Sequence, residues 1–206
     1  MSFTLKRGLS NIYIAEVTTD NEESFVTGNP EKLIPAGEMG VSADSESTPY
    51  YFDNSVFAIV SREGSSEISI TGAGLRAAAI AKLNNKTIDE ATGAVFDEGV
   101  MSGEKYFALG AEKDNIDGTK ELFWFMKGTF AIPEESAKTI GEDTDASGTE
   151  LTYTAVPTVH KFAATNKVCK RVVIDTESTE VMAEQNWFAQ VVTPDNANTV
   201  VQKVTA

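Results

Sequence analysis

The residues able to do acid–base or nucleophilic chemistry are few and scattered in this sequence. His160 is the single histidine, and it lies in a strand-like segment beside Lys161 with no serine or cysteine motif nearby. We therefore expect a structural role for it rather than general-base catalysis. Cys169 is the single cysteine, which excludes an internal disulfide and favours a small, partly buried thiol. The chain has no HExxH, CxxC, GxSxG or GxxxxGK[ST] motif. The sequence predicts a protein that is not an enzyme.

Three further patterns resemble ligand sites but favour ordinary turns. Gly72-Ala73-Gly74 precedes a helical segment, yet it lacks the third glycine of a phosphate-binding loop. Asp114 to Gly118 begins like a Ca²⁺ loop without the terminal glutamate. Glu134 and Glu135 could form a Ca²⁺ site or a glycosidase pair only if a cleft set them apart at the right distance. We expect turns and a solvated acidic loop here, with no metal and no cofactor.

The charge balance limits the possible partners. The chain of 206 residues has 31 acidic and 17 basic side chains, a net charge of −14. Such a chain is unsuited to tight binding of nucleic-acid phosphates or of an anionic membrane surface. No apolar run reaches the roughly 18 residues of a membrane-spanning helix, and the first residues lack the apolar core of a signal peptide. We expect a folded chain made in a cytoplasm, with no membrane anchor.

The elements that would position any site are mostly strands. Alternation and apolar runs bounded by turn residues predict a mainly β fold in one domain, 1–206. The predicted strands are 9–19, 25–26, 67–71, 94–97, 151–164 and 170–175, together with a hairpin over 106–131. Alanine-rich 74–84 predicts one short helix, and 178–192 a possible second one. Residues 35–49 are expected to form a long loop or an exposed hairpin, and residues 1–8 an N-terminal arm. Residues 193–206 are expected to form either a flexible C-terminal arm or an added strand.

The hairpin at 106–131 is predicted to organise the chain. A five-residue loop from Asp114 would place Lys113 opposite Thr119, and successive side chains would alternate between two faces. Both faces would be apolar, which requires cover on two sides, and we expect a second copy of the chain to supply one of them. The candidate subunit-interface residues are Phe107, Leu109, Phe123, Trp124, Phe125 and Met126, together with Tyr50, Tyr51 and Phe52.

Four stretches, taken in order, resemble one family. Residues 8–15 (GLSNIYIA) are similar to the opening "G-L-x-N-hydrophobic-Y-x-A", and 50–54 (YYFDN) to an "LYADD/N" segment. The run from Glu67 to Asp89 resembles a strand, a short helix and a "T-Y-D" run. Residues 106–110 (YFALG), 123–130 (FWFMKGTF) and 133–135 (PEE) match "Y-V-A-L-G-F … Y-R-Y-V-W-L-Y-K-G-K-F-x-x-P-E-E". The chain thus resembles the major tail proteins, or tail tube proteins, of long-tailed siphophages of Gram-positive bacteria.

The resemblance covers about residues 8–165, and it carries expectations of its own. Ala73 and Gly74 depart from it, because many relatives have acidic residues there, and the last forty residues are less similar. It implies a β-sandwich or partial barrel with one short flanking helix, closing into hexameric rings that stack into the tail tube of a virion assembled in the host cytoplasm. DNA would pass non-specifically through an acidic lumen. Implied partners are further copies and the tape measure, tail terminator and distal tail proteins. Ring-stacking candidates in the 35–49 loop are Glu38, Asp44 and Glu46.

Two other functions stay open at this point. A β-sandwich module could bind carbohydrate or cell wall through an aromatic platform of Tyr50, Tyr51 and Phe52. Alternatively, the chain could form the tube of a tail-like injection system. For a phage tube we also expect a monomer that waits for an initiator, with the arms and the 35–49 loop mobile until assembly.

Overall fold

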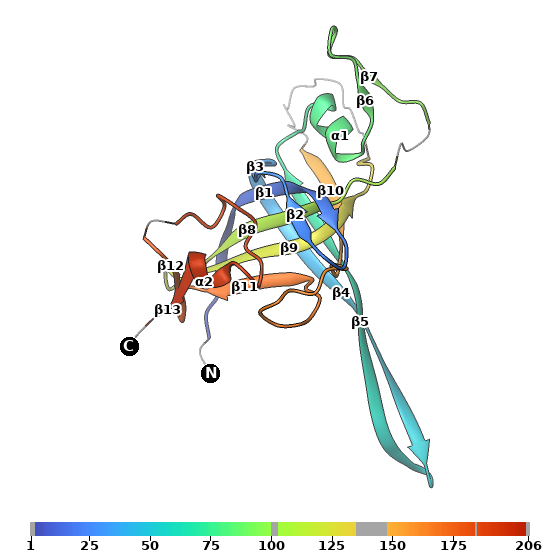
Figure 1. Ribbon diagram of the computed structural model, residues 1–206, viewed down its shortest axis with the longest axis vertical. Helices are drawn as coiled ribbons and strands as arrows, with labels where there is room; N and C mark the ends of the chain where they lie inside the picture. The colour runs from blue at the N-terminus through green and yellow to red at the C-terminus, as the bar shows by residue number, and fades with distance from the viewer. Residues whose placement is uncertain (1–2, 100–102, 135–147, 184, 205–206) are drawn as a thin grey trace, which may run out of the picture.

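The computed structural model describes residues 3–99, 103–134, 148–183 and 185–204 (Figure 1). Strands hold 54% of the residues and helices 6%, which confirms the mainly β fold, and the sheets do not close into a barrel. The strands are β1 (Lys6–Asp20), β2 (Phe25–Thr27), β3 (Glu31–Lys32), β4 (Ala36–Phe52), β5 (Ser55–Gly72), β6 (Thr87–Ile88), β7 (Val95–Phe96), β8 (Phe107–Asn115), β9 (Lys120–Phe130), β10 (Thr149–Val156), β11 (Arg171–Asp175), β12 (Thr179–Val181) and β13 (Val201–Lys203). The helices are α1 (Ala77–Leu83) and α2 (Ala197–Val200).

One large antiparallel sheet forms the body of the molecule. Its strand order is β2-β1-β8-β9-β10-β5-β4. Two strands lie off this path, since β3 pairs with β1 and β11 pairs with β9. The second edge of β9 is therefore shared: β11 pairs with its first half, and β10 with its last residues. This sharing places the β8–β9 hairpin at the centre of the sheet, as its apolar sequence predicts.

The register of the β8–β9 hairpin differs from the prediction by two residues. Lys113 lies opposite Glu121, and Leu109 opposite Phe125. The loop is shorter than expected and begins at Ile116, because Asn115 continues β8 and donates its backbone N–H to the carbonyl of Thr119 at 2.9 Å. A shift of two residues returns each side chain to the same face, so the predicted division of the hairpin into two faces is correct although its pairing is wrong.

The first face of the sheet forms one apolar core. Phe107, Leu109, Phe123 and Phe125 lie in this core with Ile68 and Ile70 of β5 and Leu151 and Tyr153 of β10. The two isoleucines are fully buried, as the alternation at 67–71 predicts. The Tyr153 hydroxyl donates to the Phe107 carbonyl at 2.7 Å, which satisfies a polar group in a buried position.

The second face of the sheet is covered by the C-terminal part of the same chain. Trp124 and Met126 are fully buried there, with Trp187, Val191, Val192 and Val200 packed over them. The Trp124 indole N–H donates to the Trp187 carbonyl at 3.3 Å. The six hairpin residues predicted to form a subunit interface are at most 1% exposed in the single chain. That prediction is wrong for these six, because the same chain covers both faces: the first core buries four of them, and residues after 160 bury Trp124 and Met126.

The remaining elements correct several expectations. Helix α1 lies inside the predicted 74–84 segment, whereas the predicted second helix at 178–192 is replaced by β12 and turns. The expected C-terminal arm contains α2 and β13, and β13 pairs with β12, so within the described residues it is an added strand rather than a free arm. The expected N-terminal arm joins β1 from Lys6 onward. Residues 36–49 form most of β4, so the loop prediction is wrong: this segment is one strand of an exposed hairpin whose second strand is β5.

Candidate assembly surface

His160 has a structural environment. Its ring lies edge-on to Phe162, with 5.1 Å between the centroids, and Nδ1 lies 3.3 Å from the carbonyl oxygen of Glu22. The Asp20 carboxylate accepts the backbone N–H groups of Val159 and His160 and the Lys127 ammonium. Burial raises the pKa of Asp20, but these hydrogen bonds outweigh it and the pKa lies below its ordinary value. The arrangement joins the β1–β2 turn to the segment after β10.

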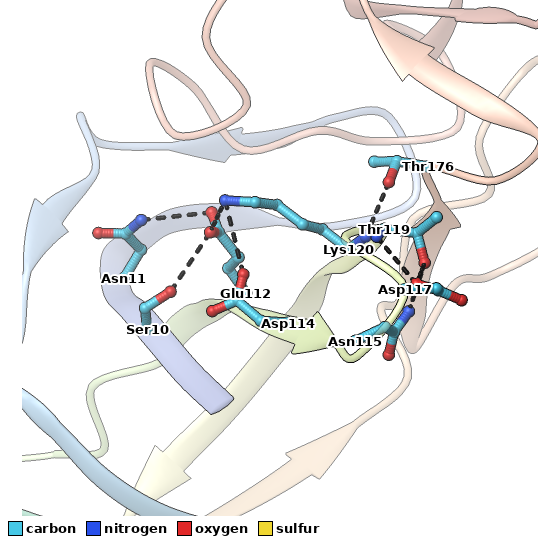
Figure 2. A network of polar contacts seen from close by, with 9 residues as sticks. All are labelled: Ser10, Asn11, Glu112, Asp114, Asn115, Asp117, Thr119, Lys120 and Thr176. Atoms are coloured by element: carbon cyan, nitrogen blue, oxygen red, sulfur yellow. Dashed lines mark hydrogen bonds and ion pairs between the residues drawn. The ribbon is translucent and has the colours of Figure 1, made fainter. Parts of the chain in front are cut away.

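The predicted Ca²⁺-like segment is a hairpin turn held by its own side chains (Figure 2). Asp117 accepts the Thr119 hydroxyl at 2.6 Å, and the Asn115 amide donates to the same hydroxyl at 2.9 Å. Asp114 faces Lys120 at 3.6 Å. Within the described ranges, no three His, Cys, Asp or Glu side chains group closely enough to hold a metal ion. The acidic side chains of this turn therefore contact neighbouring residues of the hairpin. The sequence pattern had resembled the start of a Ca²⁺-binding loop.

The other two patterns carry no ligand geometry. Gly72 is a close-packed strand end, since a Cβ there would meet the Pro35 carbonyl oxygen and the Ile34 side chain at 2.5 Å. Glu134 is exposed, while Glu135 and most of the acidic segment after it lie outside the described residues. Along the described chain, neither helix has the length and apolar character needed to cross a membrane. Cys169 is half-buried, and burial raises the pKa of its thiol.

The feature that stands apart from the body is the hairpin of β4 and β5. Only the base of β5, from Ser66 to Gly72, is paired on both sides, with β4 and with β10. Beyond this base the two strands pair only with each other, and they extend away from the body as a ribbon (Figure 1). The ribbon covers residues 44–65. Nine residues of extended chain, Asp44 to Phe52, correspond to a projection of about 30 Å.

A tight turn closes the ribbon and presents an apolar tip. Asp53 and Asn54 both have positive φ, 49° and 63°, as a two-residue type I′ turn requires. Around this turn the large apolar side chains are at least half exposed: Tyr50, Tyr51, Phe52, Val56, Phe57, Ile59 and Val60. Phe57 is the most open at 75%. Nothing in the described chain packs over them, apart from the edge-to-face contact between Phe52 and Phe57. This tip is a contiguous apolar surface of the kind that marks an interaction site.

The three aromatic candidates lie at the tip, while the three acidic candidates lie on the same strand nearer the body. Tyr50, Tyr51 and Phe52 are 50%, 64% and 60% exposed. Glu38, Asp44 and Glu46 are exposed and form no ion pair within the described residues. Sequence reasoning gave no role to Val56, Phe57, Ile59 and Val60. The available signal was that they follow the Asp53-Asn54 turn directly, as an apolar strand facing an aromatic one.

Particular side chains anchor the base of the ribbon and modify its outer edge. Lys170 forms an ion pair with Glu63 and donates to the Gly64 carbonyl at 3.2 Å, which fixes the ribbon to the segment before β11. Strand β4 is the last strand of the sheet, so its outer edge carries unpaired backbone groups. Pro49 removes one donor from that edge close to the tip. The ribbon is therefore anchored at one end and open to contact along its side and tip.

No known protein-family model matches the sequence, and no curated protein is significantly similar to it.

Proposed function

We propose that this chain is the structural subunit of a phage tail tube, assembling into hexameric rings that stack around a lumen for DNA. The sequence resemblance supports this proposal, and the mainly β body is consistent with it. The partners in assembly are further copies of the chain, and beyond them the tape measure, tail terminator and distal tail proteins. The protein would act in the virion tail after assembly in the host cytoplasm.

The observation that carries the proposal is the projecting β4–β5 ribbon. A two-stranded ribbon with its apolar residues in water is marginally stable, so this ribbon needs a surface to pack against. Its tip exposes seven large apolar side chains, and its base is anchored to the body. We propose that this surface belongs to a second copy of the chain, because other copies are the first partners that a self-assembling subunit meets. A ribbon that packs onto a different surface of the next copy makes a heterologous contact, which generates rings or open filaments.

The net charge is consistent with a conduit for DNA. A ring of six copies would carry a formal charge of −84, six times the −14 of one chain. An acidic lumen repels phosphate groups, so DNA could move through it without being retained. The same charge opposes association of the copies, and the apolar tip is a source of attraction that can outweigh it.

The test is negative-stain electron microscopy of the purified chain at high concentration, with light scattering after size exclusion. Hollow tubes or rings of six copies are expected once assembly is nucleated, for example by sheared fragments of preassembled tube. A stable dimer that forms no ring at any concentration would contradict the proposal. A tube from this experiment would fit a phage tail and a tail-like injection system equally, and the genomic neighbourhood of the gene then separates the two.

A sugar-binding module is the second candidate, and the exposed aromatic tip is the observation that favours it. Tyr50, Tyr51 and Phe52 could stack on sugar rings. Glycan-array binding by the monomer that is lost in Tyr51→Ser would support this module. Under the tube proposal, no glycan binds and the same substitution reduces assembly.

A further inference from the structure

A cluster of cations at one end of the first core distinguishes that end from the acidic remainder of the chain. Lys6, Lys113 and Arg171 converge on the single carboxylate of Glu121, from β1, β8 and β11. Lys6 contacts Oε2, while Lys113 Nζ and Arg171 Nη2 lie 3.5 Å and 2.9 Å from Oε1. Three positive charges thus share one negative charge in a chain whose net charge is −14.

The cluster is held in place by aromatic rings. The Lys113 ammonium lies 5.0 Å from the centroid of Phe123, and the Arg171 guanidinium 4.6 Å from the same centroid. Phe125 lies under the guanidinium as well, at 5.3 Å. Because both rings are buried in the core, the two cations are fixed before any ligand arrives. Preorganisation of this kind lowers the entropic cost of binding.

The cations of this cluster have more hydrogen-bond donors than the acceptors around them can satisfy. The Arg171 Nε–H is buried and has no acceptor, and in the described chain the side chains of Lys113 and Arg171 find no acceptor other than Glu121. Asp175 lies opposite Glu121 on β11, but its carboxylate accepts the backbone N–H of Glu177 at 2.9 Å. Burial lowers the pKa of Lys113, Glu121 opposes this, and the charges of Lys6 and Arg171 add to the lowering. One more carboxylate at the surface of the cluster would relieve the repulsion among the three cations.

We propose that the Lys6–Lys113–Arg171 cluster is an anion site that takes a carboxylate from the β4 strand of a second copy of this chain. The inference rests on the proposed self-assembly. Glu38, Asp44 and Glu46 are the matching groups: they are exposed and lack ion pairs within the described residues. The ribbon that carries Asp44 and Glu46 is anchored by Lys170 to its own body and projects away from it, so the acids of another copy are the complementary ones (Figure 1). Charge complementarity selects this occupant over an apolar segment.

The first experiment examines the site in the monomer, without assembly. Succinate is titrated while the Arg171 side-chain signals are followed by NMR, in wild type, Lys113→Met and Lys6→Gln. Saturable shifts are expected in wild type, with at least a fivefold weaker response in both variants. Lys6→Gln guards against misfolding, because Lys6 is half-exposed and makes no aromatic contact. Lys161→Gln, an exposed lysine elsewhere, is the matched control and should bind as wild type does. No saturable shift in wild type would overturn the anion site.

The second experiment identifies the occupant by charge exchange. Lys113→Glu is expected to slow seeded tube growth at least tenfold, and combining it with Glu38→Lys, Asp44→Lys or Glu46→Lys should restore growth in at least one pair. Failure of all three pairs, while each folds and wild type assembles, would overturn the β4 carboxylate as occupant. If wild type never assembles although succinate binds, the proposed function and the pairing between copies both fail, and the anion site stands.

Discussion

The β8–β9 and β4–β5 hairpins are both rich in apolar and aromatic residues, yet the structure treats them in opposite ways. The large apolar residues of the strands β8 and β9 between Phe107 and Met126 are at most 5% exposed, with one core on each face, and only Ile116 in the connecting loop is open. Around the turn of β4–β5, the large residues from Tyr50 to Val60 are at least half exposed. Apolar content thus indicates that a strand must be covered, while long-range contacts decide whether the same chain provides the covering residues.

The largest loss of stability is expected for a substitution at the centre of the sheet. Trp124→Ala should lower the free energy of unfolding by about 3–5 kcal/mol, because it removes a fully buried indole that packs between the sheet and the C-terminal segment. Urea denaturation followed by circular dichroism measures this loss. A cost below about 1 kcal/mol would mean that the second core is not packed as described.

A smaller loss is expected where the two strands of the central hairpin approach each other. Gly110 lies opposite Trp124, and a Cβ at Gly110 would be 2.7 Å from Cδ2 of the indole ring. Gly110→Ala should therefore cost about 1–3 kcal/mol through displacement of that ring. Thermal unfolding with tryptophan fluorescence reports both the stability and the ring environment. Gly118→Asn, in the loop with φ +88° and open space around its Cα, is the matched change and should cost less.

The polar network around Glu112, beside the β8–β9 hairpin, makes the stability of the fold depend on pH (Figure 2). Glu112 accepts hydrogen bonds from Lys120, Asn11 and Ser10. Burial raises the pKa of Glu112, but these bonds outweigh it, so the folded-state pKa lies below the ordinary value of 4.5. The stability from this group is then present above about pH 4.5 and is lost as the pH falls through the lower folded-state pKa.

Glu112→Gln should consequently cost about 1 kcal/mol at neutral pH and flatten the loss of stability in acid. Denaturant titrations at several pH values between neutrality and about pH 3 provide the measurement. Glu38→Gln, an exposed carboxylate on β4, is the control and should leave both the stability and its pH slope unchanged. An unchanged slope in the Glu112 variant would show that its hydrogen bonds do not favour the charged form.

The smallest effect on folding is expected at the tip of the ribbon. Phe57→Ser and Tyr51→Ser should change the free energy of unfolding by less than about 0.5 kcal/mol, because both side chains are already exposed in the monomer. The same variants should reduce seeded tube growth by at least tenfold if the tip packs on another copy. A large loss of monomer stability would remove the contrast between the two hairpins.

Several parts of the fold were predictable because their signals are local. The alternating strand with the buried pair Ile68 and Ile70 and the alanine-rich helix α1 follow from neighbouring residues. The two faces of β8–β9 were also correct, since a register error of two residues preserves the alternation. β4 was missed as a strand because its Gly, Ser and acidic residues have low β propensity, and pairing with β5 overrides it.

Local patterns in the sequence were enough to establish the mainly β class, the central hairpin with two apolar faces, the acidic charge and the aromatic run at Tyr50–Phe52. The tertiary structure decided which apolar surface is covered. Phe162, Trp187, Val191, Val192 and Val200 pack over one face of β8–β9, whereas no described segment reaches the tip of β4–β5. It also brought Lys6, Lys113 and Arg171 to one carboxylate, from strands more than fifty residues apart. Contacts between distant segments depend on how the whole chain packs, and no local pattern encodes them.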